Sequence, residues 1–169
     1  MENGKVKMGN SGYRCVMKLL RSEVEYDVDF ISWKVARCRV LDNDEQRAEA
    51  QTDKENGDWL TRKIELAVSE AKRLLSAYVD EYPSRMRTDE PGKEEEFTVV
   101  LRMERGWRGD VGRMNRFFYE YVVNYVLGEW FKMVMPDEAA AYAALAKDWL
   151  NELVNEARNV VIGPVTFYL

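Results

Sequence analysis

Histidine is absent from the 169 residues of this chain, and cysteine occurs only twice. Without imidazole there is no Ser-His-Asp or Cys-His catalysis, no histidine-ligated zinc and none of the usual general bases near neutral pH. The two thiols, Cys15 and Cys38, supply neither a four-thiolate metal site nor a disulfide framework. We therefore expect no catalytic residues, no cofactor, no metal site and no enzyme activity.

Long apolar runs are missing as well. The start of the chain, MENG, is polar and lacks the apolar segment of a secretion signal. No stretch approaches the apolar length that crosses a membrane. Asp42, Asp44 and Asp53 lack the midway glycine and terminal glutamate of a calcium loop. These absences predict reduced thiols, a cytoplasmic origin, no membrane partner and no calcium site.

Charge is present in both signs but is unevenly distributed. The 25 basic and 30 acidic residues give a net charge of −5, which disfavours nucleic-acid binding by the chain as a whole. Residues 1–21 nevertheless hold five basic residues and one acidic residue, and residues 97–116 hold five and two. These stretches are either solvated surface or contacts with DNA or with an acidic partner. The candidate contact residues are Arg102, Arg105 and Arg108.

Apolar side chains recur at spacings of three and four over four stretches, which predicts four helices. The first stripe persists for about five turns, longer than most strands, and ends with Cys38 as a small buried hydrophobe. The predicted helices cover residues 20–38, 58–79, 110–135 and 136–159. Met135-Pro136 separates the last two helices by so short a connection that they should form an antiparallel hairpin.

The third predicted helix is apolar on most of its circumference. Only Glu120, Asn124, Gly128 and Lys132, spaced by four, form a narrow polar stripe. A helix of this kind must be covered on most sides, either by the chain's own elements or by another subunit. Tyrosine and tryptophan are residues that interfaces favour. The candidate interface residues on this helix are Phe117, Phe118, Tyr121, Tyr125 and Trp130.

Two segments predict β structure. A strand over 97–103 with one apolar face is predicted, because large apolar residues occupy every second position, namely Phe97, Val99, Leu101 and Met103. A single strand is unstable and needs a partner. The uncharged, β-prone residues 160–169 are expected to pair with this strand or with a strand of another subunit. They add further candidate interface residues, namely Val165, Phe167 and Tyr168.

Together these patterns predict a mainly α fold. The expected architecture is a four-helix antiparallel bundle-like domain with a small β element and an extended N-terminal arm. The arm covers residues 1–17, and the helical domain covers 18–159 with an inserted strand and loop at 80–109. The strand-like tail covers 160–169.

Three short motifs carry a family resemblance. They read LLRSEV at 19–24, NGDWLTR at 56–62 and YEYVVNYVLGEW at 119–130, the last followed by the Pro136 break and an alanine-rich helix. Over roughly residues 18–158 the chain resembles a group of uncharacterised proteins encoded among the virion structural genes of phages and prophages of Bacteroidales bacteria. The tail at 160–169 departs from the basic, polar ending of that group.

The resemblance implies a small structural component of a tailed phage, of the helical head–tail connector kind that forms a ring beneath the portal. Its implied partners are copies of itself and other virion proteins such as portal or tail components, and its implied location is the virion after assembly in the bacterial host cytoplasm. The three arginines would then face channel DNA, without sequence specificity, or an acidic neighbour.

Other function classes remain open at this point. A tail-completion or tail-terminator subunit fits the same features, and so does a cytoplasmic helical adaptor that binds one protein partner. Magnesium catalysis by carboxylates alone does not need histidine. Glu120 and Glu129, within the apolar third helix, come nearest to such a site, although a solvent-facing role is the simpler interpretation.

Overall fold

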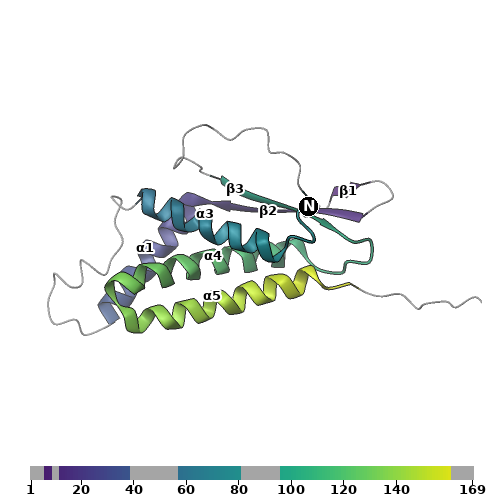
Figure 1. Cartoon of the computed structure of the whole chain (residues 1–169). Coiled ribbons are helices and arrows are strands. Elements are labelled where there is room, and N and C mark those ends of the chain that lie inside the picture. The colour runs from purple at the N-terminus through teal and green to yellow at the C-terminus, as the bar shows by residue number, and fades with distance from the viewer. Residues whose placement is uncertain (1–5, 9–11, 39–56, 81–95, 161–169) are drawn as a thin grey trace, which may run out of the picture.

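The computed structural model describes residues 6–8, 12–38, 57–80 and 96–160. In chain order the elements are β1 (Val6–Met8), β2 (Gly12–Leu20), α1 (Arg21–Cys38), α3 (Gly57–Leu74), β3 (Glu96–Met103), α4 (Val111–Val134) and α5 (Pro136–Ala157). The strands form a sheet along one side of a long helical layer (Figure 1). The prediction of a mainly helical fold with a small β element is confirmed.

The sheet is antiparallel, with β2 in the middle, and its register runs from Tyr13 opposite Met103 to Leu20 opposite Glu96. Inward side chains of β2 alternate with the outward Lys18, as expected for one buried face. The partner of the predicted 97–103 strand is therefore β2 of the same chain, and the pairing expected for the tail lies outside the described residues beyond Val160. The predicted arm at 1–17 was wrong for residues 6–8 and 12–17, which lie within β1 and β2 of the sheet.

The end of the chain is described only as far as Val160, which forms an isolated antiparallel bridge with Trp107. The remainder of the predicted C-terminal strand lies outside the described residues, and so do the predicted interface residues Val165, Phe167 and Tyr168.

Helix α4 occupies the centre of the fold. It contacts α1, α3, α5 and β2, and its side chains Phe118, Leu127 and Phe131 are fully buried. Gly128 allows α5 to approach closely, because a Cβ at this position would lie 3.3 Å from the backbone nitrogen of Ala143. Of the two covers considered for this helix, the chain's own elements supply the one seen in the structure.

Helix ends follow the expected local chemistry. Asp110 caps α4, its side chain accepting a hydrogen bond of 2.8 Å from the Arg113 backbone N–H. Pro136 opens α5 in the first turn, so the predicted hairpin of α4 and α5 is present. The burial predicted for Cys38 was wrong, because its side chain at the end of α1 is exposed, whereas Cys15 on β2 is buried.

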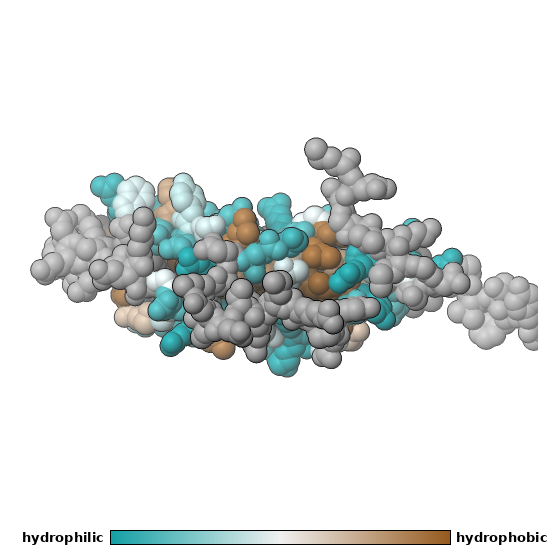
Figure 2. Space-filling view, turned by 90° about the horizontal axis from the view of Figure 1, so that it is seen from above, coloured by the Kyte–Doolittle hydropathy of each residue, from teal (hydrophilic) through white to brown (hydrophobic). Residues whose placement is uncertain are grey.

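Seen from above, the described side chains on the sheet side of the molecule are largely hydrophilic, with hydrophobic ones confined to small areas (Figure 2). This matches the alternation in β3, where Thr98 and Arg102 are exposed and Val99 and Leu101 are buried. Within the described segments, no helix is both long enough and apolar enough to cross a membrane.

Candidate protein interaction surface

Helix α1 carries large aromatic side chains on the face turned away from the core. Tyr26 is 70% exposed, Phe30 50% and Trp33 38%. Their spacing of four and three places them in one line along the helix, and we call these three residues the aromatic stripe. The core face of α1 is formed instead by residues such as Val24 and Val28, which are fully buried.

Two members of the aromatic stripe contact each other, and Arg37 contacts one of them. The rings of Phe30 and Trp33 stack with centroids 6.2 Å apart, and the guanidinium of Arg37 lies 4.9 Å from the centre of the Trp33 ring. Exposing several neighbouring aromatic side chains to water is unfavourable, since burying one such ring stabilises a protein or complex by about 1.5–3 kcal/mol. Exposed apolar surface of this kind commonly marks a site where another molecule binds.

A hollow of about 290 Å³ adjoins the first turns of α1 and is lined by Ser22, Glu23, Tyr26, Asp27 and Tyr119. The Tyr119 hydroxyl lies 2.7 Å from a carboxylate oxygen of Asp27 and 3.1 Å from the Glu23 carbonyl oxygen. Burial, and then the nearby Asp27 carboxylate, raise the pKa of Tyr119 well above its ordinary value. The hydroxyl therefore stays protonated and donates a hydrogen bond to Asp27. This hydrogen bond fastens α1 to α4.

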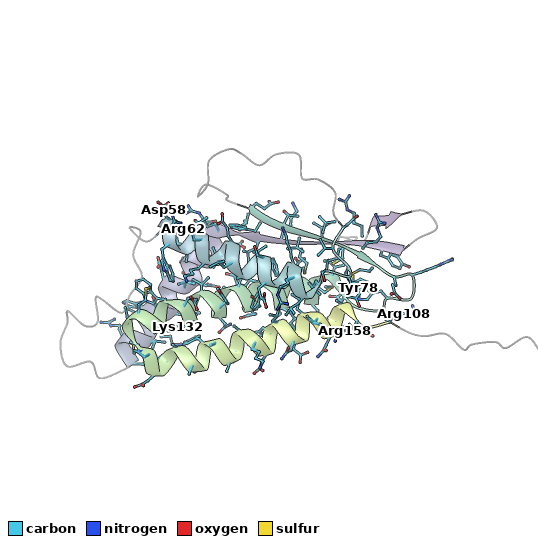
Figure 3. All side chains as sticks on the ribbon, viewed as in Figure 1. Asp58, Arg62, Tyr78, Arg108, Lys132 and Arg158 are labelled. Carbon is cyan, nitrogen blue, oxygen red and sulfur yellow. The ribbon has the colours of Figure 1, made fainter. Side chains whose placement is uncertain are left out.

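Arginines gather at the opposite end of the molecule. Figure 1 places α1 at the end where α4 turns into α5, and Figure 3 places Arg108 and Arg158 at the far end, where β3 leads into α4. Arg105, Arg108 and Arg158 are exposed, and their side chains form no ion pair within the part of the chain that is described. Arg102 differs, because it lies on the sheet and pairs with Asp80 at 3.0 Å.

The loop that presents Arg105 and Arg108 is anchored to α5. Trp107, between them, is buried, and its Nε1 donates a hydrogen bond of 2.9 Å to the Glu156 carbonyl oxygen. The backbone N–H of Arg108 donates to the Asn159 carbonyl oxygen at 2.8 Å. Of the three predicted contact arginines, the structure therefore brings two onto one rigid loop and separates the third.

The predicted interface residues of α4 lie elsewhere than expected. Phe118, Tyr121 and Trp130 are buried in the chain's own core, so an interface role was wrong for these three. Trp130 packs edge-on against Trp59 of α3, with centroids 5.6 Å apart. The other two, Phe117 and Tyr125, are half-buried.

Glu129 on α4 is held between lysines rather than left available for catalysis. Its carboxylate pairs with Lys63 of α3 at 2.7 Å and with Lys132. Burial would raise the pKa of Glu129, but the hydrogen bonds from Lys132 and Lys63 outweigh it and lower the pKa below its ordinary value. Among the described residues, no group of three or more Cys, Asp or Glu side chains is arranged to hold a metal ion.

Periodicity did not predict the aromatic stripe, although the sequence contains its signal. Tyr26, Phe30 and Trp33 form a second line of large apolar residues on a helix whose first line already fills the core face. A helix has only one core face in a two-layer domain, so a second stripe on the opposite side indicates an exposed surface.

Comparisons with known proteins give no match. The sequence matches no family model, and no curated protein and no solved structure matches it.

Proposed function

We propose that this chain is a structural subunit of a tailed-phage virion, a head–tail connector or neck subunit that forms a ring between portal and tail. The observation that carries the proposal is the aromatic stripe of α1, because a folded domain with its core already filled keeps such a surface for contact with another chain. The sequence resemblance supplies the kind of assembly. The proposal includes no catalytic residue and no cofactor.

Other assemblies would use the same surface. A tail-completion or tail-terminator subunit would bury the aromatic stripe in a different layer of the particle, and a cytoplasmic adaptor would bury it against one partner. The separation of the aromatic stripe from the exposed arginines favours a subunit that contacts two neighbours, as ring subunits do.

The test is electron microscopy of the phage that encodes this sequence, combined with mass spectrometry of its purified particles. We expect the chain among the virion proteins, in several copies, within ring density between head and tail. If the chain is absent from purified particles and is found only in the host cytoplasm, the proposal is overturned and the adaptor role is favoured.

A complementation experiment adds a matched control. Phage that lacks the gene is supplied with the variant Tyr26→Ala/Phe30→Ala/Trp33→Ala, and we expect heads and tails that fail to join. Leu145→Ala removes a similarly exposed side chain, 45% exposed, from α5 and should restore infectious particles. Equal titres for both variants would contradict a role of the aromatic stripe in the virion.

A further inference from the structure

We propose that the aromatic stripe of α1 binds the arginine-bearing end of a second copy of this chain, so that subunits join head to tail. The inference rests on the proposed function, because it names the partner of the same surface. It commits to one pair of surfaces, namely Tyr26, Phe30 and Trp33 on one copy and Arg105 and Arg108 on the next.

Charge around the aromatic stripe selects a basic partner. At 100° per residue, Glu23, Asp27 and Lys34 fall on one side of the stripe, and Glu25 and Asp29 fall on the other, so four acidic residues and one basic residue border it. The side chains of Glu23 and Glu25 form no ion pair within the described segments. A surface of aromatic rings between two acidic margins fits a partner that presents cations able to lie flat on the rings.

Arginine is the side chain that meets this requirement. Its planar guanidinium stacks on aromatic faces and also pairs with carboxylates in a fork geometry, whereas lysine presents a strongly hydrated point charge. The chain itself contains such a contact, because the guanidinium of Arg37 lies 4.9 Å from the centre of the Trp33 ring. The aromatic stripe therefore already accommodates one guanidinium within the same subunit.

The same chain carries the complementary basic surface on an ordered loop. Arg105 and Arg108 flank the buried Trp107 on the loop between β3 and α4, and the bonds of that loop to Glu156 and Asn159 fix its path. Side chains on a loop that is already ordered lose less conformational entropy on binding. Arg158 lies at the same end and extends the basic surface (Figure 3).

The arrangement also defines the symmetry of the contact. The two surfaces lie at opposite ends of the elongated molecule, so the two surfaces of one subunit cannot contact each other (Figure 1). A contact between different surfaces of identical chains is heterologous, and its repetition generates a closed ring or an open filament. A face-to-face dimer of two aromatic stripes would instead bring the acidic margins of both copies together.

Mixing two variants tests the inference. The stripe variant is Tyr26→Ala/Phe30→Ala/Trp33→Ala, and the arginine variant is Arg105→Glu/Arg108→Glu. Because the substituted residues are exposed, both variants should fold, and circular dichroism checks this. By sedimentation velocity we expect assemblies larger than dimers for the wild type, and a loss of about a hundredfold or more in association constant for each variant alone.

An equimolar mixture of the two variants should form a heterodimer, because the arginine variant keeps its aromatic stripe and the stripe variant keeps its arginines. Leu145→Ala and Lys147→Glu, on α5, change exposed side chains outside both surfaces and should assemble as the wild type does.

Three results overturn the inference: a wild-type chain that stays monomeric at several hundred micromolar, an arginine variant that assembles normally, or a mixture that stays monomeric. If the arginine variant assembles normally and the chain is found in the virion ring, the proposed function stands and only the head-to-tail contact is excluded. If the two variants form a heterodimer but the chain is absent from virions, the head-to-tail contact stands and the proposed function is excluded.

Discussion

Trp107 lies in the loop between β3 and α4, yet its ring belongs to the core. The ring is 3% exposed and is bonded to the carbonyl oxygen of Glu156 near the end of α5. The carboxylate of the same glutamate accepts the Asp110 backbone N–H at 2.7 Å and lies 3.5 Å from Arg113 Nε. One tryptophan and one glutamate thus connect the β3–α4 loop to the last helix.

Gly109→Ala should therefore destabilise the fold. A Cβ at residue 109 would lie 2.4 Å from ring atoms of Trp107, and the ring cannot move without losing its bond to Glu156. Overpacking of this kind costs about 1–3 kcal/mol. Urea denaturation measures the loss. Gly57→Ala is the matched control, because its Cβ would meet only an ordinary contact at 3.7 Å, and equal stabilities of the two variants would contradict the role given to Trp107.

At the scale of whole elements, the helices were predictable because each buries one face at a regular spacing. The apolar stripes that predicted α4 and α5 reappear in the core, and the predicted strand at 97–103 differs from β3 by one residue. The burial of α4 was also expected, but periodicity does not say whether the cover comes from the same chain or from another.

Strand β2 escaped prediction for a different physical reason. Cys15, Met17 and Leu19 alternate as a strand should, but the segment is basic and leads directly into α1, whose helical spacing can be extended back to Leu20. Its pairing with β3 joins residues about 80 positions apart, a contact that no local pattern contains. The aromatic stripe was missed because both lines of apolar residues on α1 are compatible with helix formation, and only the packing decides which of them is buried.

The α3–α4 contact should give stability that depends on pH. Glu129 has a lowered pKa in the folded chain, so its ionised form stabilises the fold at neutral pH, and this contribution is lost as pH falls through the folded-state pKa, below about 4.3. Glu129→Gln should cost about 1 kcal/mol at pH 7, and the difference from wild type should shrink below pH 4.

Chemical denaturation of Glu129→Gln at several pH values checks this prediction. Glu152→Gln removes an exposed glutamate of α5 that forms no ion pair in the described part of the chain, and it should leave the pH profile unchanged. A constant difference between Glu129→Gln and wild type from pH 7 to pH 3 would show that the ion pairs with Lys63 and Lys132 contribute nothing.

For the whole molecule, the distribution of charge matters more than the net value of −5. Acidic residues border the aromatic stripe at one end, and exposed arginines lie at the other (Figures 1 and 3). Identical chains of like net charge repel one another on average, so association requires an orientation that brings unlike ends together. The proposed head-to-tail contact has that orientation, and it would use two of the three candidate arginines, Arg105 and Arg108, without requiring DNA.

This arrangement predicts opposite salt effects for two forms of the chain. The Debye length falls from about 10 Å at 0.1 M salt to about 3 Å at 1 M, so sodium chloride should weaken association of the wild type. In Arg105→Glu/Arg108→Glu, glutamates meet the acidic margins of the aromatic stripe, and screening should relieve repulsion and strengthen the residual association. Sedimentation equilibrium at several salt concentrations measures how the association constant of each form depends on salt. A wild-type association constant independent of salt would mean that the aromatic rings bind without the arginines, because removing an attraction between opposite charges must lower affinity.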